Sequence, residues 1–192
     1  MLPSLPVNQT IIAIHAAPPR LVYVCAGAGS LALAWLHAVA GSSRTILEAR
    51  DVYAPQALAE LVVDPAPQAV SATTALALAN WALQRARMLA EGDWPLLGVA
   101  CTAAIATDRV RRGADRALVA VASRGEPWLG ALTLRGPGAS VVADRVTQEA
   151  AISELVIGAI ARACGLVAPP LSYGYALEQP EMPPGCAYRE SE

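Results

Sequence analysis

The sequence predicts an α/β protein, a three-layer α/β/α sandwich whose sheet is mostly buried. Short apolar runs of strand length alternate along the chain with longer segments that carry helical periodicity. A glycine turn joins the first clear apolar run to a helix-like segment. The chain has 192 residues, which suits one domain that is large enough to bury a real core.

The elements follow from local patterns, in the order of the chain. We expect an irregular N-terminus over residues 1–10, one domain over residues 11–164 and a proline-rich irregular tail over residues 165–192. The predicted strands are short and apolar, and they cover residues 21–25, 45–53, 96–100, 117–122 and 128–134. The predicted helices cover residues 30–40, 56–62, 73–90 and 145–164, with Ser71 and Asp144 as caps of the last two.

The charge composition excludes several kinds of chemistry. The formal net charge is −2, which gives no general attraction to nucleic acid or to an anionic membrane. All fourteen basic residues are arginine, and arginine stays protonated in proteins. A Schiff base, a P-loop lysine or a neutral amine base is therefore excluded, apart from the N-terminal amine.

The cysteines and histidines do not predict a metal centre. The four cysteines form no CxxC pair, and the two histidines lack the spacing of zinc ligands, so we expect neither a metal nor a cofactor. Reduced thiols and the lack of a basic segment after Met1 favour a cytoplasmic protein without a signal peptide. The apolar stretch 21–41 is interrupted by Gly27, Gly29 and Ser30, which favours a strand, a turn and a helix over a membrane span.

The first candidate site is the turn over residues 26–30. Gly27 and Gly29 would let the backbone approach a ligand, and Ser30 could cap the next helix and donate to a phosphate or carboxylate. The alternative is a tight turn that only packs against the sheet.

The second candidate site follows the predicted central strand. Cys101 and Thr102 would stand at its carboxyl end, where open α/β sheets bind ligands. The alternative is a buried structural cysteine, which is the usual role of a free cysteine.

The third candidate site is the segment 107–116, which contains four arginines. Arg109, Arg112 and Arg116, with Thr107, could bind a phosphate or carboxylate through forked guanidinium contacts. Two aspartates in the segment could instead neutralise the arginines in a solvated loop.

Taken in order, these segments resemble the C-terminal domain of CinA proteins, the family of nicotinamide-mononucleotide amidohydrolases. Residues 24–30 (VCAGAGS) stand where that family has Ala-Glu-Ser-Cys-Thr-Gly-Gly, and residues 41–43 (GSS) stand at its Gly-Ser-Ser. Residues 53–58 (YAPQAL) correspond to Tyr-Ser-Asn-x-x-Lys, and residues 70–79 correspond to its Val-Ser-x-x-x-Ala helix. The Gly-Ile-Ala-Gly-Pro and Gly-Asp-Arg motifs fall near residues 101–105 and 143–145.

A closer resemblance is to the CinA-like region fused to predicted cytidylyltransferase-type domains in plants. The matching segments are residues 14–18 (IHAAP), 45–48 (TILE), 98–102 (GVACT) and the arginine-rich segment 107–116. The resemblance covers roughly residues 12–164, and it implies the CinA-like fold and a possible nucleotidyltransferase partner.

Two departures from the family pattern bear on function. The family's nucleophilic serine falls on Ala26 and its partner lysine falls on Leu58, so covalent catalysis in that form is lost. The candidates that remain for catalysis are Ser30, Cys101 and Thr102. The expected ligand-binding residues are Gly27, Gly29, Ser30, Ser42, Tyr53, Thr102, Thr107, Arg109, Arg112, Arg116 and Arg145.

Three functional hypotheses follow. The first is a non-hydrolytic CinA-like protein that binds a nucleotide or a related phosphorylated metabolite. The second is an active nicotinamide-nucleotide amidohydrolase with a relocated nucleophile. The third is a structural subunit of a homo-oligomer, suggested by the many alanines and valines.

Overall fold

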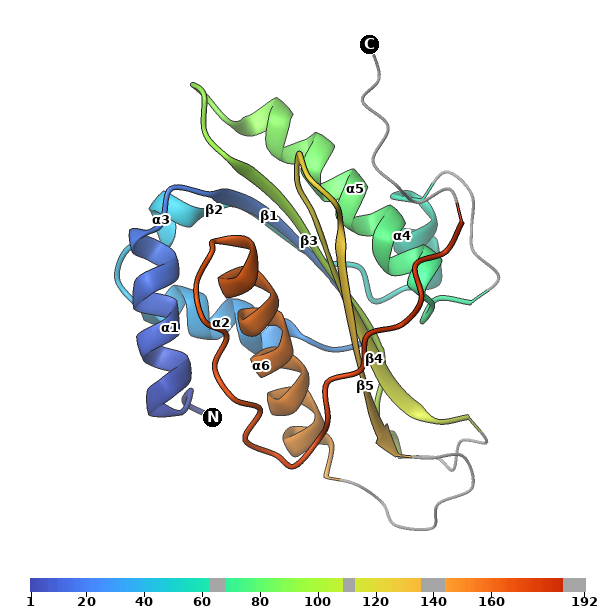
Figure 1. Cartoon of the computed structure of the whole chain (residues 1–192). Helices are drawn as coiled ribbons and strands as arrows, with labels where there is room; N and C mark the ends of the chain where they lie inside the picture. The colour runs from blue at the N-terminus through green and yellow to red at the C-terminus, as the bar shows by residue number, and fades with distance from the viewer. Residues whose placement is uncertain (63–67, 109–112, 136–143, 185–192) are drawn as a thin grey trace.

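A computed structural model describes residues 1–62, 68–108, 113–135 and 144–184 of the chain. The core of the molecule is a five-stranded sheet with strand order β2-β1-β3-β4-β5. Helices cover both faces of this sheet (Figure 1), which confirms the three-layer α/β/α prediction.

The strands place several connections at one edge of the sheet. They are β1 (Arg20–Ala26), β2 (Ile46–Asp51), β3 (Leu96–Ala104), β4 (Asp115–Ala122) and β5 (Trp128–Arg135). Strand β1 is parallel to β2 and β3, whereas β4 runs antiparallel to β3 and β5. The carboxyl ends of β1, β2 and β3 and the start of β4 therefore share one edge, which we call the carboxyl edge.

The two faces of the sheet carry different helices. One face is covered by α1 (Leu5–Ala16), α2 (Ser30–Ala38), α3 (Ser42–Thr45) and α6 (Arg145–Ala163). The other face is covered by α4 (Pro55–Ala59) and α5 (Ala72–Leu89). Ser71 and Asp144 accept hydrogen bonds from Thr74 N–H and Val146 N–H, so both predicted helix caps are confirmed.

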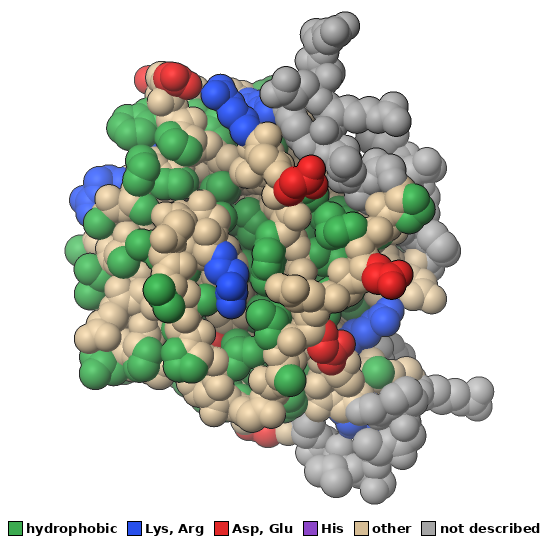
Figure 2. Space-filling model, in the orientation of Figure 1, with side chains coloured by type: hydrophobic (Ala, Val, Ile, Leu, Met, Phe, Trp, Pro, Cys, Tyr) green, Lys and Arg blue, Asp and Glu red, His purple; other side chains and the backbone are tan. Residues whose placement is uncertain are grey.

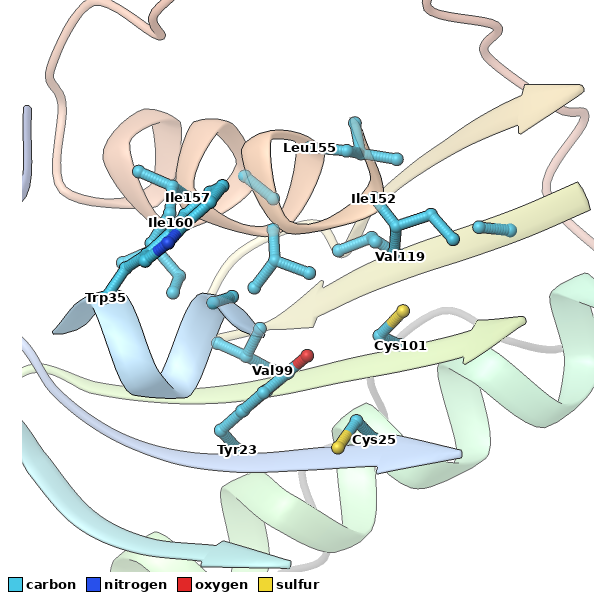
Figure 3. Close-up of a cluster of buried hydrophobic side chains, with 14 of the residues drawn as sticks. Tyr23, Cys25, Trp35, Val99, Cys101, Val119, Ile152, Leu155, Ile157 and Ile160 are labelled. Carbon is cyan, nitrogen blue, oxygen red and sulfur yellow. The ribbon is translucent and has the colours of Figure 1, made fainter. Parts of the chain in front are cut away.

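Alternate residues of each strand fill two separate cores. On the α6 side, Tyr23, Val99 and Val119 pack beneath the helix, as Figure 3 shows. On the α5 side, small residues of β1, β3 and β4 allow α5 to approach closely, and a Cβ at Gly98 would clash with backbone atoms of α5. Both faces are apolar, which explains why these strands appear in the sequence as continuous hydrophobic runs.

The N-terminal residues differ from the expectation of an irregular segment. Helix α1 begins at Leu5, with a proline in its first turn, where the missing N–H costs nothing. Val7, Ile11 and Ile14 are fully buried, and their i, i+4, i+7 spacing forms one apolar face. This face packs against α6, and that burial stabilises a helix that local composition did not predict.

Strand β3 is four residues longer than expected. It continues through Cys101 and Thr102 to Ala104, so these two residues lie inside the sheet and not after it. The prediction covered only the apolar run 96–100 that follows Pro95, and this run continues through small residues to Ala104.

The segment after α6 is irregular as far as it is described, but it packs against the protein. One antiparallel bridge joins Glu178 to Ala131 of β5, and Leu171 and Tyr175 pack against the core. In Figure 1 this segment runs back beside α6 and then crosses to the β5 edge. Within the described part of the chain, no helix combines the length and apolar character that crossing a bilayer requires.

Candidate functional site

A cavity of about 350 Å³ opens at the carboxyl edge, on the face covered by α4 and α5. Its walls come from the end of β1 and the following turn, the β2–α4 connection, α4, the approach to α5 and β3. The lining residues are Ala26, Gly27, Val52, Tyr53, Ala54, Pro55, Leu58, Ala59, Val62, Ala69, Val70, Thr74 and Ala103. Tyr53 and Thr74 supply the hydroxyl groups of this lining, and the other side chains are hydrocarbon.

Both positions that the CinA resemblance assigns to catalysis lie in this cavity. Ala26 ends β1 and Leu58 lies on α4, and both line the cavity. A methyl group and an isobutyl group thus stand where the resemblance implies a nucleophile and a base. The cavity has the position of a site but lacks that chemistry.

Two of the predicted arginines lie beside this cavity. Arg145 donates from Nη1 to the Ala106 carbonyl oxygen at 2.7 Å and from Nη2 to the Tyr53 hydroxyl at 3.5 Å. Arg116 donates from Nη2 to the Val70 carbonyl oxygen at 2.7 Å. Both side chains remain exposed and contact residues that line the cavity or the connections next to it.

The remaining residues of the arginine-rich segment are described only in part. Arg109 and Arg112 fall outside the described residues. Thr107 is exposed at the start of the β3–β4 connection. The anion site of this segment thus stays a prediction, and Arg116 is its one arginine among the described residues.

The glycine turn is a tight turn, and its N–H groups already have a partner. Gly27 and Gly29 have φ of +88° and +97°, and a Cβ at Gly27 would clash with the Ala103 carbonyl oxygen. The Glu149 carboxylate accepts from Gly29 N–H at 3.0 Å and from Leu31 N–H at 2.9 Å. The acceptor at this turn is therefore a side chain of α6, and the expected ligand contact of the turn stays a prediction.

The three candidate nucleophiles do not meet at one point. Ser30 donates to Glu149 Oε1 at 3.2 Å on the α6 side of the sheet. Cys101 is also buried on that side (Figure 3), whereas Thr102 lies on the α5 side, in register with Ala26. Alternation along the strand separates Cys101 from Thr102, and Ser30 is exposed whereas Cys101 and Thr102 are fully buried.

The protonation of Cys101 argues against a nucleophilic role. Burial raises the pKa of its thiol well above the ordinary value, and the neighbouring Cys25 raises it further. A Cys101 thiolate is therefore disfavoured, and the thiolate is the reactive form. Cys101 is a structural core residue, which was the alternative considered for it.

Thr102 and Ser42 also differ from their predicted positions. Thr102 is fully buried, and its Oγ1 has no hydrogen-bond partner among the described residues. Ser42 begins α3, which immediately precedes β2 and so lies at the opposite edge of the sheet. Ser42 lies there because α2 returns the chain to the edge of the sheet at which the parallel strands β1 and β2 begin.

A buried polar network that the sequence did not predict fixes the ends of the β3–β4 connection. Asp115 is 1% exposed and accepts two hydrogen bonds from Arg135, at 2.8 and 3.0 Å, and one from Gln148, at 3.2 Å. Gln148 Oε1 also accepts from Ala106 N–H at 2.7 Å. No local pattern marks these residues, because they are brought together from β4, β5 and α6.

Other polar features of the described residues are dispersed. On the face in Figure 2, arginine and acidic side chains are scattered among apolar and backbone atoms and do not gather into one patch. The described residues contain no group of three or more histidine, cysteine, aspartate or glutamate residues that could hold a metal ion.

Comparisons with known proteins bear on the fold. Neither a protein-family model nor a curated protein matches the sequence. The competence/damage-inducible protein CihA from Agrobacterium tumefaciens is similar in structure, with a TM-score of 0.61 and 20% identity, over 82% of this chain and 94% of that one. A CinA superfamily protein from Enterobacter cloacae has a TM-score of 0.57 and 14% identity, over 86% and 92% of the two chains. One from Klebsiella pneumoniae has a TM-score of 0.56 and 16% identity, over 83% and 94%. The chain therefore has the α/β fold of CinA superfamily proteins.

Proposed function

We propose that this chain is a CinA-like protein that binds a nucleotide or a related phosphorylated metabolite, without the Ser/Lys amide chemistry implied by the resemblance. The observation that carries the proposal is the cavity at the carboxyl edge, whose lining includes both Ala26 and Leu58. A cavity at the expected position supports binding, while hydrocarbon at both chemical positions argues against covalent catalysis.

The size and lining of the cavity suit such a ligand. A volume of about 350 Å³ lies within the usual range for small-molecule sites, about 300–1,000 Å³. The apolar walls fit a planar base or pyridine ring, and the exposed Tyr53 hydroxyl can fix its orientation. Ligand pockets commonly combine apolar walls with a few polar groups of this kind.

The neighbouring arginines suit the phosphate. A guanidinium group carries five N–H donors, and the bonds described for Arg116 and Arg145 use only part of each set. Both groups are exposed beside the cavity, so each can bind a phosphate oxygen through a charge-assisted hydrogen bond.

The direct test is titration calorimetry with nicotinamide mononucleotide, NAD and common nucleotides. We expect at least one to bind, and Arg116→Ala or Arg145→Ala to weaken it by about tenfold to a hundredfold, since charge-assisted bonds contribute about 1.5–3 kcal/mol. Arg124→Ala is the matched control, because its exposed side chain lies on the β4–β5 connection, at the opposite edge of the sheet. If no compound binds, or if all three variants bind equally, the proposal is wrong.

The enzymatic alternative is tested in the same preparation. Ammonia release from nicotinamide mononucleotide that is lost in Ser30→Ala or Cys101→Ala would establish a relocated nucleophile instead. Ser30 is the stronger of the two candidates, because its hydroxyl already donates to a carboxylate.

The proposal also includes a location and partners. We propose that the protein is cytoplasmic, because free thiols such as Cys25, Cys101 and Cys164 persist there. We also propose that it forms a homo-oligomer and assists a nucleotidyltransferase. Light scattering tests the oligomer. A defined oligomer that shows no thermal shift with any nucleotide would favour the purely structural hypothesis.

A further inference from the structure

A second cavity, of about 370 Å³, lies on the opposite side of the sheet from the first. Its walls come from α6, the start of β5 and the segment that follows α6, which Figure 1 shows running beside that helix. Trp128, Pro170 and Tyr175 supply much of the apolar wall. The cavity shares no lining residue with the site at the carboxyl edge.

A buried carboxylate lines this cavity. Glu154 is 2% exposed, and its Oε2 accepts one hydrogen bond, from Ser172 N–H at 2.7 Å. No arginine, histidine or N-terminal amine of the described residues lies within ion-pair distance of it. Arg162 also lines the cavity, but it is exposed and eight residues away, about 12 Å along the helix axis. A buried carboxylate is costly unless it is paired, and no cationic partner of Glu154 is found among the described residues.

A glycine keeps part of the cavity wall open. Gly158 lies inside α6, where alanine is the better helix former. A Cβ at this position would lie 3.6 Å from the Ala168 Cβ and 3.9 Å from the Pro169 Cδ, which are ordinary contacts. Packing therefore does not require glycine here. What glycine does provide is space on the helix surface, one turn from Glu154.

The aromatic side chains complete a site for a positive charge. Trp128 and Tyr175 are partly buried against the core and both line the cavity. Aromatic ring faces attract cations, and tryptophan does so most strongly. A carboxylate, two aromatic rings and apolar walls together match an ammonium group attached to a hydrocarbon body.

We propose that this cavity binds a small primary amine with an apolar or aromatic body. The ammonium group pairs with Glu154, and the body lies between Trp128 and the surface left open by Gly158. This inference does not depend on the proposed nucleotide site, since the two cavities lie on opposite faces of the sheet.

The test compares a charged probe with a neutral one of the same shape. We expect phenethylammonium chloride to bind saturably in titration calorimetry, and phenethyl alcohol to bind at least about tenfold more weakly. Glu154→Gln should weaken the amine to the level of the alcohol. Glu181→Gln removes the same charge from an exposed position on the segment that follows α6, and it should leave binding unchanged.

A second variant covers the case in which Glu154→Gln does not fold. Gly158→Leu keeps Glu154 and fills the cavity, so it should abolish amine binding, whereas Gly158→Ala should retain part of it. Absence of amine binding to the wild-type protein would overturn the proposal. Equal binding of the two probes, unchanged amine binding in folded Glu154→Gln, or unchanged amine binding in Gly158→Leu would each also overturn it.

Discussion

Replacing Glu149 by alanine should measurably destabilise the protein, because this side chain caps a helix from a distant part of the chain. Helix α2 begins after Gly29, which has no side chain with which to cap it. The Glu149 carboxylate accepts from Gly29 N–H, Leu31 N–H and the Ser30 hydroxyl, at 2.9 to 3.2 Å. The variant would leave both backbone N–H groups without this acceptor.

The magnitude follows from two contributions. Loss of a side-chain cap costs about 0.5–2 kcal/mol, and loss of a negative charge near a helix N-terminus costs about 0.3–1 kcal/mol. The free energy of unfolding should therefore fall by about 1–3 kcal/mol. For a protein of this size, each kcal/mol shifts the midpoint of thermal unfolding by about 2–4 °C, so Tm should fall by about 2–12 °C.

Urea unfolding followed by circular dichroism measures this difference, with calorimetry for Tm. Glu149→Gln retains one acceptor oxygen and should show a smaller loss than Glu149→Ala. Glu181→Ala is the control for removing an exposed carboxylate, and it should stay within about 0.5 kcal/mol of wild type. If Glu149→Ala is as stable as this control, the carboxylate does not hold the turn and the reasoning fails.

Three further predictions test the cores on either side of the sheet. Burial lowers the pKa of His15 below 6.5, so the unfolded chain binds more protons as the pH drops below about 6.5. The unfolding free energy, measured against pH, should therefore fall in this range. Gly98→Ala should cost about 3 kcal/mol or more in urea unfolding, since its Cβ meets the α5 backbone, while Gly125→Ala in an open turn should cost little. A thiol reagent should modify Cys164 well before Cys101. Cys164 is half-buried and its pKa is raised to about 11, whereas Cys101 is fully buried and its pKa is raised well above the ordinary value. The opposite order of labelling would contradict the packing.

The sequence predicted those elements whose burial can be recognised from a short run of neighbouring residues. The strands β1 and β4 are buried on both faces, and such strands appear as short continuous apolar runs. Ser71 could be identified as a cap because capping residues act within three positions. Helix α1 was missed because only the spacing of Val7, Ile11 and Ile14 marks it, among exposed and half-buried neighbours.

The candidate site was predictable only in outline. The glycine turn was identified from the sequence, and it packs so closely against β3 that a Cβ at Gly27 would clash with the Ala103 carbonyl oxygen. The cap from Glu149 could not be foreseen, because 120 residues separate it from Gly29. The positions of Cys101 and Thr102 were wrong because a shift of four residues in the end of a strand changes an edge residue into a core residue.

The geometry of the carboxyl edge does not depend on the side chains that the resemblance associates with catalysis. The first turns of α6 hold three connections: Arg145 bonds to Tyr53 and to the β3–β4 connection, Gln148 bonds to the same connection, and Glu149 bonds to the glycine turn. None of these contacts involves Ala26 or Leu58. Hydrocarbon at those two positions is therefore compatible with these contacts at the cavity rim. This independence of the contacts from Ala26 and Leu58 is the physical basis for proposing binding without hydrolysis.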